Sequence, residues 1–250
     1  MNRAILLVDI EESGKCRINE EAISMLRGLP SPISVISVAG LYRTGKSFLL
    51  NRFLGLQDAF EIGPSVNPCT KGLWIWGEPT ILPNGGSSIL IDTEGLGSFE
   101  RDSTTDMHIF TLAVLLSSVF IYNSMGNIDE QALEALSLVC KLTEHIQVKE
   151  FGENADQYSL YFPKFIWALR DFTLDIGSFA GAPREYLEDC LRPIHPESSQ
   201  DLKQKNEIRR SITSYFRDRE CYTFIRPVSD ERQLRNINTL PYEDLRPQFR

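Results

Sequence analysis

The sequence predicts an α/β domain whose central sheet is mostly parallel and carries helices on both faces. Apolar runs of strand length recur along the chain and alternate with stretches of helical periodicity, which is typical of a parallel sheet with both faces covered. The chain has 250 residues, of which 42% are apolar, so it can bury one sizeable core. No repeat or low-complexity linker divides it. We therefore expect residues 1–250 to form one domain.

The expected strands are short and are separated by turns or helices. They lie at residues 6–9, 33–40, 72–79, 87–95, 117–124, 164–172 and 221–227. The sequence LPNGG at 82–86 is typical of a tight turn, so the strands on either side of it predict a hairpin and one antiparallel edge strand. Helical spacing occurs at residues 48–55 and 127–147.

Charge and composition exclude several classes of protein. A net charge of −8 argues against general affinity for nucleic acid or anionic membranes, which need a basic face. The longest apolar passage, residues 109–122, is shorter than the roughly 18 residues of a transmembrane segment. The five cysteines are scattered without a CxxC pair, so we expect neither disulfides nor a zinc site, and a cytoplasmic location. Membrane association would require segments outside this sequence.

The segment GLYRTGKS, residues 40–47, has the spacing of a P-loop, a loop that binds phosphate. A β-branched strand precedes it and a helix follows it, so backbone N–H groups and the helix amino end can face a β-phosphate. Lys46 neutralises β- and γ-phosphate oxygens, and the hydroxyl of Ser47 ligates Mg²⁺. The expected nucleotide contacts in this segment are Gly40, Leu41, Tyr42, Arg43, Thr44, Gly45, Lys46, Ser47 and Phe48.

Two further features fit a nucleotide site that holds Mg²⁺. The motif Asp92-Thr93-Glu94-Gly95 closes an apolar strand. An aspartate at this position holds the Mg²⁺ shell, and the amide of Gly95 can sense a γ-phosphate. In the loop between this motif and the P-loop, Thr70 can complete the metal shell when a γ-phosphate is present. Either feature alone would more often be an ordinary turn or loop residue.

The pair Arg170-Asp171, at the end of a predicted strand, indicates which base is bound. The usual NKxD signature of GTPases does not occur in the chain. A carboxylate at this strand end accepts hydrogen bonds from N1–H and the 2-amino group of guanine, whereas adenine offers an acceptor at N1 and would be repelled. The alternative for such a pair is a surface ion pair. Because the same chain has a P-loop, we expect Asp171 to recognise guanine.

Five segments together resemble the large GTPase domain of the guanylate-binding proteins, which are relatives of the atlastins in the dynamin superfamily. The segments are GLYRTGKSFLLNRF (40–53), CTKGLWIW (69–76), DTEGLGS (92–98), LAVLLSSVFIYNS (112–124) and ALRDFTLD (168–175). The likeness extends from near Leu7 to the carboxyl terminus. It implies a Ras-like sheet enlarged by insertions. It also implies hydrolysis of GTP with Mg²⁺, stimulated when two such domains form a homodimer across their nucleotide faces.

The resemblance implies further structure and also marks a departure. A guanine cap over the base is matched here by residues 227–249, and the protein is expected to continue into a last helix of the GTPase domain and a helical stalk. Many family members have a catalytic serine two positions before the threonine that matches Thr70. This chain has Pro68 there, and proline has neither a hydroxyl nor an N–H group to position water.

Cleavage of GTP requires an oriented water and a cation. Small GTPases place a glutamine after the glycine of the second motif, but this chain has Leu96 there. Glu94 is the nearest polar candidate to position water. Arg43 lies within the P-loop and can act in cis as an arginine finger. The expected catalytic residues are Arg43, Lys46, Thr70 and Glu94, with Ser47 and Thr70 at the metal.

Three functions stay open on the sequence. The favoured one is a GTPase that forms GDP and phosphate, with further cleavage to GMP undecided. The second is a slow or inactive GTP-binding switch or scaffold, because Pro68 replaces the serine of the loop. The third and least favoured is an ATP-binding P-loop protein such as a kinase.

Overall fold

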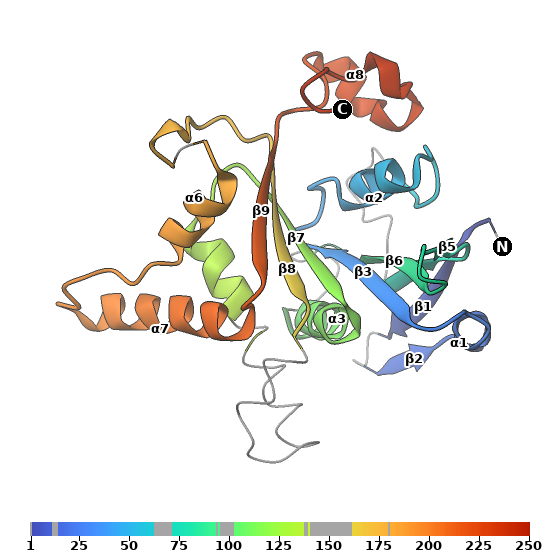
Figure 1. Cartoon of the computed structure of the whole chain (residues 1–250), viewed down its shortest axis with the longest axis horizontal. Coiled ribbons are helices and arrows are strands. Elements are labelled where there is room, and N and C mark those ends of the chain that lie inside the picture. Colours follow the sequence, from blue (N-terminus) through green and yellow to red (C-terminus); the bar gives the residue numbers. More distant parts are fainter. Residues whose placement is uncertain are drawn as a thin grey trace.

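The computed structural model describes residues 2–11, 15–62, 72–93, 95, 103–137, 140, 162–179 and 181–250 of the chain. A single nine-stranded sheet runs through these residues, with strand order β2-β1-β4-β6-β3-β7-β8-β9 and with β5 paired to β6 (Figure 1). Helices pack against it, so the predicted α/β fold is confirmed. Pro68, Thr70, Glu94 and Leu96, which the sequence singled out, lie outside the described residues.

Five parallel strands form one part of the sheet. They are β6 (Ser87–Thr93), β3 (Ile33–Ala39), β7 (Val119–Met125), β8 (Lys164–Arg170) and β9 (Arg219–Phe224). Each pairs in parallel with its neighbour in that order. Because parallel strands point the same way, their carboxyl ends share one edge of the sheet, which is where ligands bind in open α/β sheets.

The antiparallel part is larger than the sequence predicted. It contains β4 (Leu73–Trp76), β5 (Thr80–Ile81), β1 (Ala4–Ile10) and β2 (Cys16–Ile18). The expected hairpin is present, since β4 and β5 both pair with β6. The other side of β4 pairs with β1, and β2 pairs with β1 in turn. The sequence therefore predicted too few antiparallel strands. It gave no signal for β2 and β5, because they have only three and two residues and show no periodicity.

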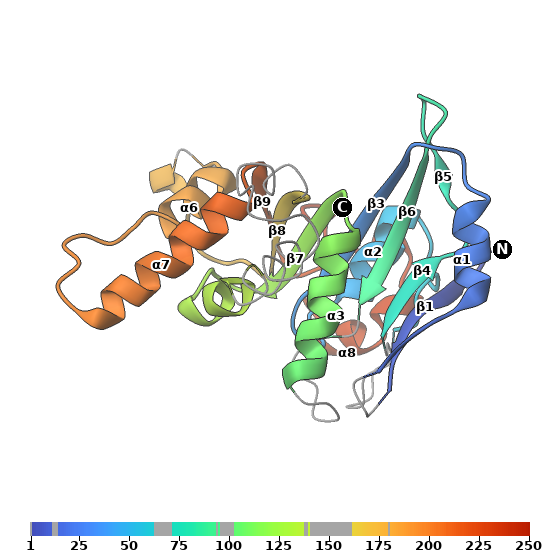
Figure 2. The ribbon, with the colours of Figure 1, turned by 90° about the horizontal axis from the view of Figure 1, so that it is seen from below.

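Helices cover both faces of the sheet, as predicted. On β8, Phe165 and Trp167 pack into one buried cluster with α1 (Glu20–Arg27), α3 (Ser103–Leu116), α6 (Pro183–Cys190) and α7 (Gln200–Tyr215). The alternating residues Ile166 and Ala168 face a second cluster with α2 (Lys46–Leu54). Figure 2 shows α6 and α7 beside the β8–β9 end of the sheet and α1 beside the β1 end.

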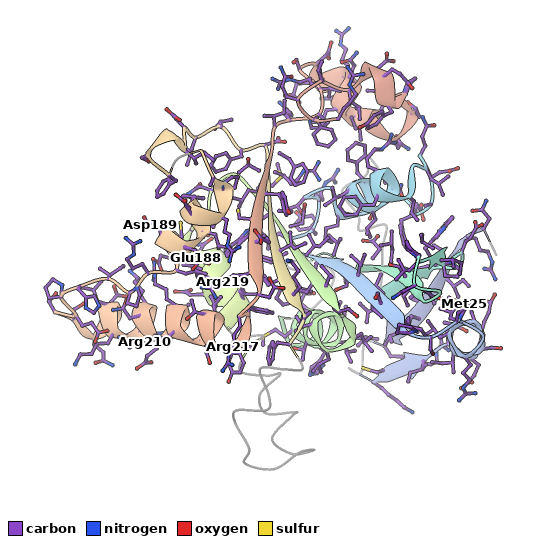
Figure 3. The ribbon with its side chains drawn as sticks, viewed as in Figure 1. Met25, Glu188, Asp189, Arg210, Arg217 and Arg219 are labelled. Carbon is purple, nitrogen blue, oxygen red and sulfur yellow. The ribbon has the colours of Figure 1, made fainter. Side chains whose placement is uncertain are left out.

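Local interactions fix the ends and positions of these helices. Ser199 caps α7 by accepting a hydrogen bond from the amide of Leu202. On β9, Arg219 donates a 2.6 Å hydrogen bond to Glu188 of α6, which ties that helix to the edge strand (Figure 3). Residues 130–137 are helical, within the helix predicted at 127–147. No helix of the described residues is long and apolar enough to cross a membrane.

The carboxyl-terminal segment, residues 227–250, leaves β9 at the ligand-binding edge and packs beside α2 (Figure 1). It contains α8 (Glu231–Arg235) and two short 3₁₀ helices, η2 (Ile237–Thr239) and η3 (Tyr242–Asp244). A third 3₁₀ helix, η1 (Gly177–Phe179), follows β8. The segment is held by a small apolar cluster of its own, made of Val228, Ile237, Leu245 and Phe48 of α2, with Ile62, Leu234, Leu240 and Phe249 at its margin.

Candidate functional site

The P-loop connects β3 to α2 and is held by hydrogen bonds at several points. The side-chain amide of Asn123, at the end of β7, donates to the carbonyl of Thr44 at 2.9 Å. The Thr44 hydroxyl donates to the carbonyl of Leu41 at 2.8 Å. The ammonium group of Lys46 donates to the same carbonyl at 3.1 Å and is only 6% exposed. These three hydrogen bonds fix the shape of the loop and the position of its lysine.

Two residues of this loop have a left-handed backbone conformation. Gly45 is the amino-terminal cap of α2 and has φ of 80°, a left-handed conformation that a glycine adopts without strain. Arg43 also has a positive φ, of 60°, which costs a side-chain-bearing residue about 1 kcal/mol or more. Such strain is typical of functional loops. The amino end of α2 also carries a partial positive charge, which favours an anion.

A hydroxyl and a carboxylate meet beside the P-loop. Ser47 Oγ donates to Asp92 Oδ2 at 2.6 Å, and the other carboxylate oxygen accepts from the amide of Thr93 at 3.1 Å. Asp92 is fully buried at the carboxyl end of β6. These two oxygen ligands suit Mg²⁺, which commonly takes one or two protein oxygens and completes its shell with phosphate and water. Thr70, the other expected ligand, lies outside the described residues.

Gly95 places the second motif directly against the P-loop. A Cβ atom at this position would lie 2.1 Å from the Cα of Tyr42, which no side chain tolerates. The close approach explains why glycine is needed here, and it brings the Gly95 backbone to the edge of the phosphate loop. The sequence predicted this neighbourhood for Gly95. Glu94, the residue before it, lies outside the described residues.

A cavity of 340 Å³ joins the P-loop to the predicted base-recognition pair. The P-loop residues in its lining are Arg43, Thr44 and Gly45, and the base-recognition pair contributes Arg170 and Asp171. The carboxyl-terminal segment forms another part of the lining of this cavity. Its residues there are Pro227, Glu231, Leu234, Arg235, Ile237 and Asn238. A cavity of this size is typical of small-ligand sites. The carboxyl-terminal segment thus lines the same cavity as Asp171.

Asp171 is turned toward this cavity by its backbone and faces one basic side chain. Its φ of 53° is left-handed, so its direction differs from that of the preceding strand residue. Arg226 places Nε 3.7 Å from Asp171 Oδ2 and donates from its two terminal nitrogens to Glu231 at 2.7 and 3.1 Å. The carboxylate is 29% exposed and therefore accessible to a ligand in the cavity.

Arg170 points a different way from Asp171. It is only 4% exposed, and Nη1 donates to the carbonyl of Gly45 at 3.4 Å. Burial lowers the pKa of Arg170 to about 10, and the neighbouring carboxylate of Asp171 partly offsets that effect. The guanidinium is therefore charged at neutral pH. It lies beneath the P-loop, next to the cavity that it helps to line.

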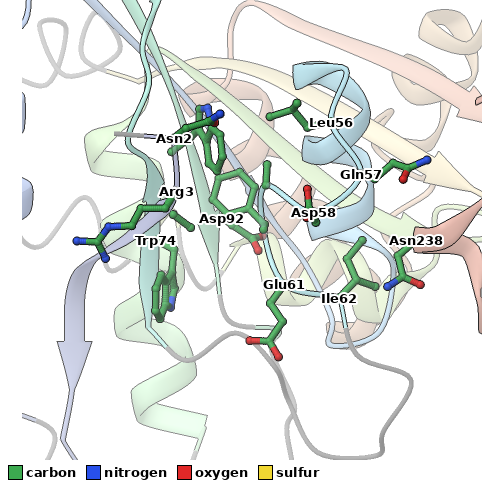
Figure 4. A pocket seen from close by; sticks show the side chains of 14 residues that line it. Asn2, Arg3, Leu56, Gln57, Asp58, Glu61, Ile62, Trp74, Asp92 and Asn238 are labelled. Atoms are coloured by element: carbon green, nitrogen blue, oxygen red, sulfur yellow. The ribbon is translucent and has the colours of Figure 1, made fainter.

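A second cavity, of 660 Å³, lies beside Asp92 (Figure 4). Its lining includes Asp92, Glu61 and Trp74. Ile62 and Asn238 line both cavities, so the two meet at these residues. Asp92, which accepts the hydrogen bond of Ser47, therefore borders this second cavity.

Two residues that support the P-loop and Asp171 were not predicted from the sequence. Asn123 contacts the P-loop and Arg226 contacts Asp171, yet neither residue was predicted. For Asn123 a signal was present, because a polar residue ends the apolar run FIYN at the ligand-binding edge of the sheet. For Arg226 the spacing of residues gives no signal, because its contacts depend on how the chain after β9 packs beside Asp171.

The chain matches one protein family and is similar to several of its members. The family model described as guanylate-binding protein, N-terminal domain, matches residues 13–250. The chain is 39% identical to guanylate-binding protein 4 of Homo sapiens over 258 aligned positions, which cover 100% of this chain and 40% of that protein. It is 40% identical to guanylate-binding protein 7 of Mus musculus, again over 100% of this chain and 40% of that protein. The chain thus spans about two fifths of the length of these relatives.

Proposed function

Because this chain belongs to the guanylate-binding protein family and matches its N-terminal domain, we propose that it binds GTP and GDP and hydrolyses GTP to GDP and phosphate. The observation that carries this proposal is the 340 Å³ cavity, which joins the P-loop to Asp171. A phosphate loop alone would fit any nucleotide. A carboxylate that lines the same cavity as that loop favours guanine over adenine.

The phosphates are held by the loop and the start of α2. Backbone N–H groups of residues 41–48 surround the β-phosphate, and Lys46 supplies positive charge to the β and γ oxygens. For this the ammonium group exchanges its bond to the Leu41 carbonyl for a phosphate oxygen, a stronger partner because it is charged. The prior burial of Lys46 limits the entropy lost on binding.

Ser47 and Asp92, together with Thr70, would hold Mg²⁺. When bound, the ion neutralises charge that develops on the β- and γ-phosphate oxygens. The Ser47 hydroxyl, which here donates to Asp92, would supply one oxygen to the ion, and the bond from the Thr93 amide would keep the Asp92 carboxylate oriented.

Arg43 stabilises the transition state for phosphoryl transfer. Its position inside the loop and its exposed side chain allow it to swing toward the γ-phosphate. Glu94 positions the attacking water through its main chain or a bridging water. Pairing of two copies across the nucleotide face turns Arg43 inward, and the exposed Leu41 next to it offers apolar contact area for that pairing. Further cleavage to GMP and a cytoplasmic location stay predictions.

The proposal is tested by mixing the purified chain with GTP or ATP and resolving GDP, GMP and phosphate over time. Turnover of GTP with little turnover of ATP is the expected result. Tight binding of GTP without turnover would favour the slow switch suggested by Pro68, and a preference for ATP would contradict the assignment of Asp171.

A further inference from the structure

Arg170 has an environment that base recognition does not explain. Its guanidinium is nearly inaccessible to solvent, and its hydrogen bond to Gly45 is long, at 3.4 Å. Its Nε atom has no hydrogen-bond partner among the described residues. A buried charge that lacks its full set of hydrogen bonds is costly unless other groups stabilise it.

Three phenyl rings surround this charge. The guanidinium carbon lies 5.4 Å from the ring centre of Phe249, 5.7 Å from that of Phe224 and 5.9 Å from that of Phe48. At such distances a ring face attracts a cation, and the attraction is larger when the cation is desolvated. The rings come from the carboxyl-terminal segment, from β9 and from α2. Arg170 is therefore held where three separate parts of the chain meet.

Phe249 is one of the three rings that form a cage around Arg170, but it does not line the cavity between the P-loop and Asp171. Its ring lies 5.9 Å from Phe48 and 6.3 Å from Phe224, centre to centre. It packs at the margin of the apolar cluster that holds the carboxyl-terminal segment on α2. It is not among the residues that line the cavity between the P-loop and Asp171. An effect of Phe249 on nucleotide binding must then pass through other residues.

The carbonyl that Arg170 holds controls a phosphate-binding amide. The Gly45 carbonyl also accepts the first helical hydrogen bond of α2, from the amide of Leu49 at 3.0 Å. Because a peptide unit is planar and trans, the N–H of Lys46 points opposite to this carbonyl. Fixing the carbonyl therefore aims the Lys46 N–H out of the amino end of α2, where a β-phosphate binds.

We propose that Arg170 is a positioning residue through which the packing of Phe249 sets the geometry of the P-loop. The phosphate site is fully formed only when the carboxyl-terminal segment is packed on Phe48 and closes the cage. This inference rests on the proposed binding of guanine nucleotides. It assigns to the carboxyl-terminal segment an action on the phosphates, in addition to its place opposite the base.

The test compares dissociation constants for GDP and GMP, since GMP lacks the β-phosphate that the Lys46 amide would bind. We expect Phe249→Leu, which keeps an apolar side chain but removes the ring, to weaken GDP binding about tenfold. GMP binding should change less than about twofold. The ratio of the GMP to the GDP dissociation constant should therefore fall at least about fivefold. Phe249→Tyr keeps the ring and should restore the wild-type ratio.

A matched control and a stability measurement separate this effect from a general loss of structure. Leu240→Ala removes an aliphatic side chain from the margin of the same cluster and no ring from the cage, so its ratio should equal that of the wild type. Thermal unfolding without nucleotide, measured for all variants, reports any loss of fold. A loss of fold would weaken GDP and GMP binding in the same proportion.

Equal weakening of both nucleotides in Phe249→Leu, or no change in either, would overturn the role of Arg170. Failure of the wild-type chain to bind GDP would instead contradict the proposed function. A lower ratio in Phe249→Leu together with an unchanged ratio in Phe249→Tyr would support the inference.

Discussion

Ser47 donates a hydrogen bond of 2.6 Å to Asp92, and this contact joins the first turn of α2 to the end of β6. Two parallel strands that are neighbours in the sheet thus bring their following loops together, although the two residues are far apart in the sequence. The contact places a hydroxyl and a carboxylate where an ion between protein and phosphate would need them.

Removal of this hydroxyl should change the requirement for Mg²⁺. We expect Ser47→Ala to raise the Mg²⁺ concentration for half-maximal GTP turnover at least about tenfold, since one direct ligand is lost. Ser88→Ala, on the same strand as Asp92 but away from its end, is the matched control. The measurement is GTP turnover at increasing Mg²⁺. An unchanged midpoint in Ser47→Ala would place the ion elsewhere.

Selectivity for guanine should depend on Asp171. Asp171→Asn replaces two acceptor oxygens with one oxygen and one donor, so binding of GDP should weaken and that of xanthosine diphosphate should strengthen. Competition of both nucleotides against a fluorescent GDP analogue measures the change. Asp175→Asn, a few residues further along the same loop, serves as the control. If the two preferences stay as in the wild type, Asp171 does not read the base.

The hydrogen bond from Asn123 of β7 to the P-loop should contribute to the free energy of unfolding. Asn123 is fully buried, and its side-chain amide holds the Thr44 carbonyl at 2.9 Å. Asn123→Ala should lower the free energy of unfolding by about 1–3 kcal/mol, because it leaves a buried carbonyl without its donor. Denaturant unfolding measures this, with the exposed turn residue Asn84→Ala as the control. Equal stability of the two variants would show that the contact contributes little.

The sequence predicted the parallel strands and the P-loop because each has a local pattern. The run ISVISVA followed by GLYRTGKS identifies a strand, a phosphate loop and a helix start without knowledge of any distant residue. The antiparallel strands β2 and β5 were missed because two or three residues carry no period. Asp171 was predicted to recognise the base from its place at a strand end, and it lines the cavity beside the P-loop.

The supports of the site could not be predicted for a different reason. Arg170 and Asp171 are adjacent, yet one side chain packs under the P-loop and the other faces the cavity. That division depends on the left-handed backbone at Asp171 and on the return of Phe249 to α2. Both are tertiary features that leave no signal in the spacing of residues.

The replacement at Pro68 gives a prediction about rate. If a serine there positions water in the family, Pro68→Ser should raise kcat for GTP while the dissociation constant for a non-hydrolysable analogue changes little. Pro64→Ser, in the same loop, controls for a general effect of removing a proline. A flat or lower kcat in Pro68→Ser would mean that this chain positions water by other groups.

In the proposed mechanism the cleavage of GTP depends most on Arg43. Turnover of GTP by the wild type and by Arg43→Ala tests this dependence. Both proteins are assayed over a wide range of protein concentration, beside a binding assay with a non-hydrolysable GTP analogue. We expect the substitution to lower kcat by about 10³ to 10⁵, with affinity changed less than about tenfold. Wild-type specific activity should rise with protein concentration as copies pair. An equal loss of binding and turnover in Arg43→Ala would make this arginine a ground-state phosphate ligand and contradict its role in cleavage.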